Sequence, residues 1–180
     1  MIVLVGASAS GKTEIAKHLY KDYGYQKCIT TTTRLPRIGE FDGVDYHFID
    51  RNTFNEIKSK DLFLEVVSYQ DNLYGTQKKD INLNGVVIVE PDGANSIVEK
   101  IGHEAYVVFV ESSEEVRKAR MIERKDQLEK ILKRLESDRI IFNSNQFIRI
   151  NLRIKNEKDN LDDLALKIHK NYQKYLDTNS

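Results

Sequence analysis

The sequence contains a single cysteine, Cys28, so an intrachain disulfide is excluded. A chain without disulfides fits a reducing compartment, and we expect Cys28 to be a small core residue rather than a nucleophile. Proline is also rare, with two residues, and no internal repeat or low-complexity segment occurs. The lack of a possible intrachain disulfide argues against a disulfide-stabilised secreted domain.

Net charge and long apolar runs are lacking as well. Lys and Arg total 28 and Asp and Glu total 28, so no general affinity for nucleic acid or anionic membrane is expected, and any positive field must be local. No apolar run approaches the ~20 residues of a membrane span. The opening residues MIVLVGAS carry no basic segment of the kind that begins a signal peptide. We therefore expect a cytoplasmic protein without nucleic-acid or membrane partners.

The apolar runs that are present are short and are followed by helical patterns. Hydrophobic residues make up 40% of the 180 residues and charged residues 31%, which suits one globular domain. Fully apolar runs are typical of parallel strands buried on both faces. The alternation predicts an α/β fold, a three-layer α/β/α core with a parallel sheet. The runs are 2–5, 86–89 and 106–110, and the helical patterns are 14–23, 93–101 and 113–124.

Two stretches interrupt this alternation and divide the single domain 1–180. Residues 30–78 predict a small mixed α+β insertion that faces a ligand, and residues 117–139 predict a helical lid. Leu128, Ile131, Leu132 and Leu135 follow helical spacing and predict one narrow apolar seam in that lid. The core then comprises about 1–29, 79–116 and 140–180, and it ends in a packing helix with Asn160 as its N-cap.

The segment GASASGKT, Gly6–Thr13, matches the phosphate-loop pattern G-x-x-x-x-G-K-[ST]. It lies between a buried strand and a helix, which is the context that this motif requires. Its backbone N–H groups and the helix N-terminus favour phosphate, Lys12 is predicted to reach the β- and γ-phosphates, and the Thr13 hydroxyl is predicted to ligate Mg²⁺. The predicted ATP-binding residues are Gly6, Ala7, Ser8, Ala9, Ser10, Gly11, Lys12 and Thr13.

A second cluster of charge suggests where an acceptor phosphate binds. Arg34 and Arg37 flank Pro36, which fixes its own backbone angle and stiffens the residue before it. Two arginines held close together suit a phosphate, because each planar guanidinium donates two parallel hydrogen bonds. Tyr46 and Tyr74 have hydroxyl groups that can join them. The alternative is a solvated basic turn with core tyrosines.

Together these segments resemble the guanylate kinase family of nucleoside monophosphate kinases. The matching stretches are GASASGKT, TTTTRLPRIGEFDGVDYHF, FLEVVSYQDNLYGT, VVIVEPDGA and an Arg-rich stretch ending in KRL, in family order from residue 2 to about 136. The resemblance implies that Arg34, Arg37, Tyr46 and Tyr74 hold the GMP phosphate. It also implies catalytic roles for Lys12 and the lid residues Arg120, Arg124 and Arg134. The residues that it implies for guanine are Thr30, Glu65, Thr76 and Asp92.

The chemistry of guanine supports those base contacts. Guanine presents N–H donors and the O6 acceptor on its pairing edge, so a carboxylate such as Glu65 matches the donors and a threonine hydroxyl matches O6. Adenine would leave the buried carboxylate facing a lone pair, and sites of this kind reject the wrong base by ~10⁴-fold or more. The attacking GMP phosphate is already largely ionised near neutral pH, so no strong general base is needed. None of His18, His47, His103 and His169 is expected to bind a metal.

Two departures from the family leave alternatives open. Glu90 stands where the family commonly has aspartate, and Asp92 then follows so closely that it is a candidate for guanine, for water around Mg²⁺, or for both. The lid is about one residue short between Arg124 and Arg134, so the register of Arg134 relative to the family pattern is left open.

The overall prediction from the sequence is an enzyme that converts ATP and GMP to ADP and GDP with Mg²⁺, as a monomer or homodimer. The alternatives are a non-catalytic binding module and a kinase with another phosphorylated acceptor.

Overall fold

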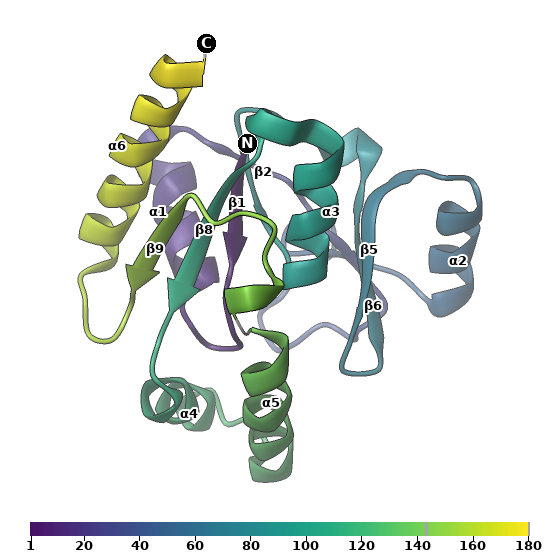
Figure 1. The fold of residues 1–180 in the computed structure, drawn as a ribbon. Helices are drawn as coiled ribbons and strands as arrows, with labels where there is room; N and C mark the ends of the chain where they lie inside the picture. The colour runs from purple at the N-terminus through teal and green to yellow at the C-terminus, as the bar shows by residue number, and fades with distance from the viewer. Residues whose placement is uncertain (143, 180) are drawn as a thin grey trace.

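A computed structural model describes residues 1–142 and 144–179. Within these residues, five parallel strands form the main sheet in the spatial order β2-β7-β1-β8-β9 (Figure 1). The strands are β1 (Ile2–Val5), β2 (Gln26–Lys27), β7 (Gly85–Ile88), β8 (Tyr106–Glu111) and β9 (Leu152–Lys155). The predicted α/β class is confirmed, and the carboxyl ends of these strands meet at one edge, where ligands bind in open α/β sheets.

Alternate residues of the central strand β1 supply two separate cores, as the pleat of a strand requires. Ile2 and Leu4 pack with α1 (Lys12–Tyr23) and α6 (Leu161–Asn179) on one face. Val3 and Val5 pack with α3 (Pro91–Ile101) on the other. Because both faces are covered, the strand contains no polar position, which explains its uniform IVLV sequence.

Local signals set the ends of the two helices on the first face. Gly11, immediately before α1, has φ +98°, and Gly24, immediately after it, has φ +70°; both angles lie in the left-handed region that favours glycine. The Asn160 side chain accepts a hydrogen bond of 3.0 Å from the Asp162 N–H, as expected for the N-cap of α6. Cys28 is buried in the core of the opposite face, as predicted.

A second, smaller sheet has the order β4-β3-β6-β5 and lies beside α3 (Figure 1). Phe54 of α2 (Arg51–Ser59) stacks on Phe63 with ring centroids 4.5 Å apart, which closes the outer side of this sheet. The mixed pairing, with β3 and β4 parallel and the others antiparallel, matches the insertion predicted over 30–78. Its strands are β3 (Thr31–Thr32), β4 (His47–Phe48), β5 (Phe63–Tyr69) and β6 (Asn72–Gln77).

Helices α4 (Glu114–Glu123) and α5 (Leu128–Ile141) project beyond the carboxyl edge of the main sheet (Figure 1). The predicted apolar seam is wrong for Leu128 and Leu132, which are 60% and 52% exposed. Only Ile131 and Leu135 pack against Met121 of α4, because a two-helix projection covers one side of each helix and leaves the other in solvent.

Short 3₁₀ turns complete the described chain at η1 (Lys78–Asp80), η2 (Gly102–Glu104) and η3 (Ser144–Gln146). Across residues 1–142 and 144–179, none of the helices combines the length and apolar character needed to cross a membrane.

Candidate active site

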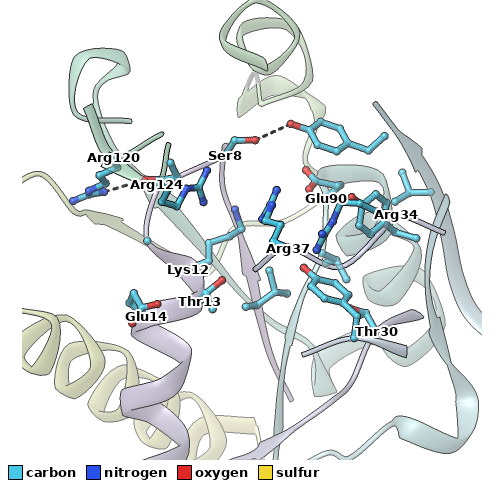
Figure 2. A pocket seen from close by; sticks show the side chains of 18 of the residues that line it. Ser8, Lys12, Thr13, Glu14, Thr30, Arg34, Arg37, Glu90, Arg120 and Arg124 are labelled. Atoms are coloured by element: carbon cyan, nitrogen blue, oxygen red, sulfur yellow. Dashed lines mark hydrogen bonds between the residues drawn. The ribbon is translucent and has the colours of Figure 1, made fainter. Parts of the chain in front are cut away.

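A cavity of about 630 Å³ opens at the carboxyl edge of the main sheet, between the phosphate loop, the small sheet and α4. Figure 2 shows Lys12 and Arg37 pointing into this space. The tertiary structure therefore brings the two halves of the predicted site to one cavity. The predicted site residues that line it are Ser8, Ala9, Gly11, Lys12, Thr13, Thr30, Arg34, Arg37, Tyr46, Glu65, Tyr74, Arg120 and Arg124.

Other predicted residues lie outside this lining. Thr76 is fully buried and its hydroxyl donates to Glu65 Oε1 at 2.6 Å. Asp92 is exposed on the first turn of α3 and is not among the residues that line the cavity, although the neighbouring Gly93 packs against Glu65. Arg134 is bound instead to Asp126 and Gln70. Gly6, Ala7 and Ser10 of the phosphate loop are not among the lining residues.

The phosphate loop has the backbone that its motif requires. A Cβ at Gly11 would lie 2.1 Å from Asn156 Nδ2, so no other residue fits there without displacing that side chain. Lys12 Nζ folds back over the loop and donates to the carbonyl oxygens of Gly6 and Ala7. Burial lowers the pKa of Lys12, and the carboxyl of Glu90 opposes that shift. The loop thus presents a desolvated ammonium group at the edge of the cavity.

Arg34 and Arg37 meet at one carboxylate, that of Glu40. Arg34 pairs with both Glu40 oxygens, at 2.9 and 3.1 Å, and the Arg37 backbone N–H donates to Glu40 at 2.7 Å. The Arg37 guanidinium lies further from the same carboxylate, with 3.8 Å between Arg37 Nη1 and Glu40 Oε1. Burial lowers the pKa of Arg37, and the guanidinium groups of Arg34, Arg134 and Arg124 lower it further. This concentration of positive charge favours an anion in the cavity.

Aromatic rings form the wall beside these arginines. The Arg34 guanidinium lies 5.3 Å from the ring centre of Tyr46 and 5.6 Å from that of Phe48. Tyr46 and Tyr74 pack edge to face, with ring centres 6.3 Å apart. Burial raises the pKa of Tyr46 to about 12, and the neighbouring Tyr74 makes a smaller contribution in the same direction. The Tyr46 hydroxyl therefore stays protonated and remains a hydrogen-bond donor at neutral pH.

Glu65 of β5 is a buried carboxyl group with one oxygen committed and one free of protein partners. Thr76, opposite it on β6, bonds Oε1, while Oε2 has no hydrogen-bond partner among the described residues. A Cβ at Gly93 would lie 2.9 Å from Oε2, so the glycine leaves room for the carboxyl group. Burial raises the pKa of Glu65 to about 7. An unpaired buried oxygen of this kind indicates a ligand that donates hydrogen bonds.

The arginines of α4 are already held by neighbours. Arg120 donates to the Ala9 carbonyl at 3.2 Å and to Asn156 at 3.0 and 3.2 Å, which ties α4 to the phosphate loop and to the end of β9. Arg124 and Arg134 share the carboxylate of Asp126, each at 2.8 Å. All three arginines therefore gather at the same end of the molecule, although only Arg120 and Arg124 line the cavity.

Comparison with known proteins identifies the family to which a chain with this phosphate loop and these arginines belongs. A family model described as guanylate kinase matches residues 1–174. The chain belongs to the guanylate kinase family. The resemblance inferred from the sequence is thereby confirmed.

Two curated guanylate kinases illustrate the similarity. The protein from Thermus thermophilus is 34% identical over 143 residues, which cover 76% of this chain and 65% of that protein. The chain thus spans slightly less than two thirds of that relative's length. The protein from Clostridium perfringens is 31% identical over 176 residues, which cover 93% of this chain and 80% of that protein.

A crystal structure of guanylate kinase from Anaplasma phagocytophilum shares the fold. It matches with a TM-score of 0.70 at 18% identity and covers 96% of this chain and 84% of that one. The five-stranded parallel sheet and the small mixed sheet are thus the architecture of a guanylate kinase.

Glu90 is a cavity residue that the sequence prediction did not include in the site. It lies two residues beyond the end of β7 and lines the cavity, and its Oε2 has no partner among the described residues. Burial raises the pKa of Glu90 to about 7, while the nearby Lys12 ammonium lowers it. A carboxyl group immediately after a buried parallel strand was the available signal, because such positions lie at the ligand-binding edge.

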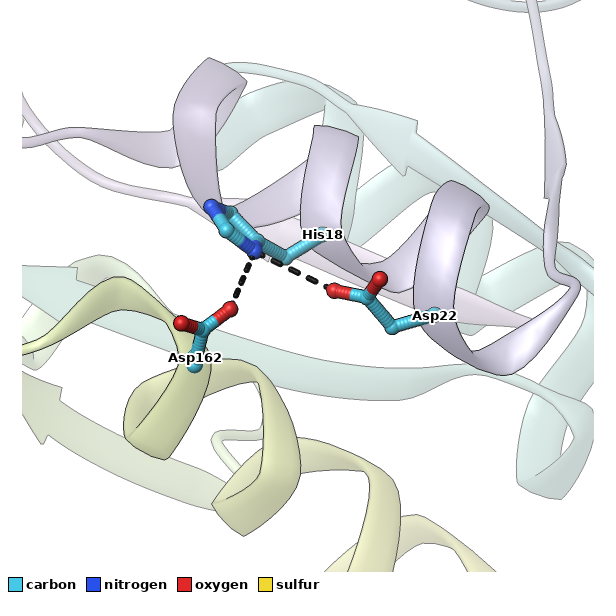
Figure 3. Close-up of side chains that lie close together, drawn as sticks. All are labelled: His18, Asp22 and Asp162. Carbon is cyan, nitrogen blue, oxygen red and sulfur yellow. Dashed lines mark hydrogen bonds and ion pairs between the residues drawn. The ribbon is translucent and has the colours of Figure 1, made fainter.

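His18 lies between two carboxylates on the side formed by α1 and α6 (Figure 3). Its Nδ1 is 3.2 Å from Asp22 and 2.7 Å from Asp162, so the three possible ligand atoms lie within 4.8 Å of one another. The expectation that the histidines lack a metal-binding arrangement is therefore too simple for His18. Asp22 and Asp162 are nevertheless exposed and His18 is half-buried, so the three residues are accounted for as a surface contact between α1 and α6, since charge pairs of this kind are common.

Proposed function

We propose that this chain is a guanylate kinase that transfers the γ-phosphoryl group of ATP to GMP and releases ADP and GDP. The observation that carries the proposal is one cavity lined by a phosphate loop, two convergent arginines and a buried carboxyl group with a free oxygen. The first element suits a nucleoside triphosphate, the second a phosphate and the third a base with N–H donors.

On the donor side, residues Gly6–Thr13 bind the ATP phosphates through backbone N–H groups at the start of α1. Lys12 leaves the loop carbonyls and reaches the β- and γ-phosphates. Thr13 would hold Mg²⁺, and the hydroxyl of Thr13 and the free carboxyl oxygen of Glu90 provide the oxygen ligands that this ion prefers. When bound, Mg²⁺ supplies charge neutralisation between the phosphates.

On the acceptor side, Arg34, Arg37, Tyr46 and Tyr74 hold the GMP phosphate. The substrate phosphate takes over the guanidinium groups that Glu40 now occupies, so binding exchanges one anion for another. A phosphate oxygen of GMP then attacks the γ-phosphorus of ATP, the bond to the β,γ-bridging oxygen breaks, and ADP carries away the electron pair. Alignment and charge compensation carry the catalysis, and no protein nucleophile takes part.

The base is read by Glu65 and Thr30, which both line the cavity. The free Oε2 of ionised Glu65 accepts from the guanine N–H groups, while Thr76 acts through Glu65 by fixing its other oxygen. The Thr76 proton is therefore committed to the carboxyl group, so Thr30, which lines the cavity, is the better donor for O6. Asp92 does not line the cavity, whereas Glu90 lines it close to Lys12 and is the acidic group that we assign to the phosphate side.

The lid arginines complete the site around the transferring group. Arg120 stabilises the loop from the side of α4, and Arg124 and Arg134 provide positive charge once Asp126 releases them. Asp126 keeps both guanidinium groups close to their working position before substrates arrive. This arrangement also suits the shortened lid, because one carboxylate orients both arginines.

The direct test is turnover with a panel of acceptors. The protein is incubated with Mg·ATP and GMP, dGMP, AMP, CMP or UMP, and ADP release is measured. We expect turnover with GMP and little with AMP, CMP or UMP. Activity with AMP or UMP but none with GMP would contradict the guanine assignment, whereas tight GMP binding without any turnover would support the binding-module alternative.

The division into core, acceptor subdomain and lid, together with the cytoplasmic location and the monomeric or dimeric state, stays a prediction. Two substrates that fill one cavity from opposite sides should draw the acceptor sheet and the lid together and exclude water. Small-angle scattering with and without a bisubstrate analogue tests this expectation. An unchanged radius of gyration would count against closure.

A further inference from the structure

Asp138 of α5 is a fully buried acid outside the predicted site. Its side chain is 0% exposed, and its two oxygens accept three hydrogen bonds. The donors are the Ser8 backbone N–H at 3.0 Å, the Tyr69 hydroxyl at 2.7 Å and the Arg117 guanidinium at 2.8 Å. A buried carboxylate is tolerated only when it is paired and hydrogen-bonded, and here both conditions are met.

The three donors belong to three different parts of the molecule. Ser8 is in the phosphate loop, Tyr69 ends strand β5 of the small sheet, and Arg117 is on α4 one turn before Arg120. Ser8 Oγ and the Tyr69 hydroxyl are also bonded to each other, at 2.9 Å (Figure 2). Asp138 is thus the point where the donor loop, the acceptor sheet and the lid meet.

We propose that Asp138 is a positioning residue for phosphoryl transfer and that the Tyr69 hydroxyl latches the acceptor sheet to the phosphate loop through it. The inference rests on the proposed function, because that function assigns the donor and acceptor sides. Beyond that function, the network forms a physical connection through which a bound acceptor changes the binding of the donor nucleotide.

The connection begins at the acceptor clamp. The ring of Tyr74, which lines the cavity, lies edge to face with that of Tyr69, with centres 6.4 Å apart. A phosphate that draws Tyr74 toward the arginines therefore changes the packing of Tyr69. Because the Tyr69 hydroxyl bonds both Asp138 and Ser8, the shift reaches a backbone N–H of the phosphate loop without passing through the nucleotide.

The latch also reaches the lid. Gln70 Nε2 donates to the Tyr69 hydroxyl at 3.2 Å, and Arg134 Nε donates to Gln70 Oε1 at 3.1 Å. Arg117 joins the same carboxylate from α4. Burial and the Asp138 carboxylate raise the pKa of Tyr69, so its hydroxyl keeps the proton that this network needs. Closure of the lid and of the acceptor sheet is therefore linked at one point.

The test is Tyr69→Phe, which keeps the ring and removes only the hydroxyl. Tyr175→Phe is the matched control, because its hydroxyl bonds the His103 carbonyl, far from the cavity lining. Calorimetry with a non-hydrolysable ATP analogue, with and without saturating GMP, gives the coupling between the two sites. We expect GMP to tighten analogue binding in the parent chain by a factor within the usual range of about 5 to 150.

In Tyr69→Phe we expect that factor to fall toward one while the affinity for the analogue alone changes by less than about threefold. Turnover at saturating substrates should fall about tenfold. The control variant should keep both values. A Tyr69→Phe protein that retains the parent coupling overturns the latch, even if it melts at a lower temperature, since lost stability alone would show a merely structural role.

Hydrogen exchange of the unliganded protein separates this inference from the proposed function. Loss of the hydroxyl should speed exchange in the peptide that contains Ser8, and the control should not. A parent chain that neither binds nor phosphorylates GMP would sink the proposed function, and the exchange result would still decide whether Tyr69 holds the loop. Unchanged exchange at Ser8 would overturn the latch independently of any nucleotide.

Discussion

The donor side and the acceptor side of the cavity are built in different ways. The proposed donor side is one continuous segment, Gly6–Thr13, which would bind phosphate through its backbone and whose position is set by β1 and α1. The proposed acceptor side is assembled from the side chain of Thr30, just before β3, and from side chains of the loop between β3 and β4, of β5 and of β6. The donor side therefore depends on chain conformation, whereas the acceptor side depends on how distant segments pack.

This difference separates general binding from specificity. A backbone loop contacts phosphates that every nucleoside triphosphate shares, so it carries no information about the acceptor. In the proposed site, side chains such as Glu65 and Arg34 distinguish a base and a phosphate by their own shape and charge. Substitutions on the two sides should consequently have separable effects on turnover, affinity and selectivity.

The largest effect is expected on the donor side, at Lys12. Replacing Lys12 with Ala should lower turnover about 10²–10³-fold, because a charge that stabilises the transferring group is lost. The affinity for GMP should stay within about threefold, since Lys12 does not bind the acceptor. Steady-state kinetics and GMP calorimetry measure the two quantities. Lys17→Ala, an exposed lysine on the same helix, is the control and should behave like the parent.

If GMP binding collapsed in Lys12→Ala while turnover at saturating GMP survived, the assignment of Lys12 to the donor side would be wrong.

On the acceptor side the largest effect is expected at Glu65. Glu65→Gln should weaken GMP binding about 100-fold and reduce discrimination against AMP, because bonds to a charged acceptor are worth about 1.5–3 kcal/mol each. Since the pKa of Glu65 is raised to about 7, GMP affinity in the parent chain should increase between pH 6 and pH 8. Titrations across that range should show a flatter profile for the variant. Unchanged selectivity would make Glu65 a structural residue.

The same carboxyl group predicts how stability depends on pH. Its folded pKa, about 7, lies above the ordinary glutamate value of 4.5, so the folded chain binds the proton more tightly than the unfolded chain. The resulting stabilisation is complete below pH 4.5 and is lost as the pH rises through 7. Between pH 4.5 and pH 8, the parent should lose on the order of 3 kcal/mol of unfolding free energy that Glu65→Gln does not lose. Urea unfolding at several pH values measures the difference, and parallel curves would contradict it.

A smaller effect is expected at the phosphate clamp. Arg34→Lys keeps the charge but loses the planar fork, so GMP affinity should fall about tenfold. Binding of guanosine, which has no phosphate, should be unaffected, which distinguishes the clamp from the base site. Arg153→Lys, an exposed arginine on β9, serves as the control. Equal losses for GMP and guanosine would place Arg34 outside the clamp.

The smallest effect is expected outside both sides, at His18. Asp162→Asn removes an exposed partner of His18 and should change the unfolding free energy by about 0.2–1 kcal/mol, with turnover unchanged. Thermal unfolding with and without a divalent cation provides the measurement. A cation-dependent rise in melting temperature that is lost in Asp162→Asn would show that the group binds metal after all.

Prediction from sequence succeeded where the physical signal was local. The phosphate loop, the buried strands and the N-cap of α6 are each encoded within a few residues, so their positions followed from the pattern. It failed for Leu128 and Leu132, where helical spacing is correct but no neighbouring element covers them. It missed Asp138, which stands in a run of charged residues and gives no sign that it is buried.

The sequence by itself determined the α/β class, the phosphate loop and the candidate acceptor arginines, because backbone geometry and strand burial are specified by neighbouring residues. Only the tertiary structure decided which groups share the cavity: it brings Glu90 in, leaves Asp92 in solvent and joins Ser8, Tyr69 and Arg117 at Asp138. These contacts join residues that are far apart in the chain. Burial and pairing at such distances depend on packing, which no local pattern specifies.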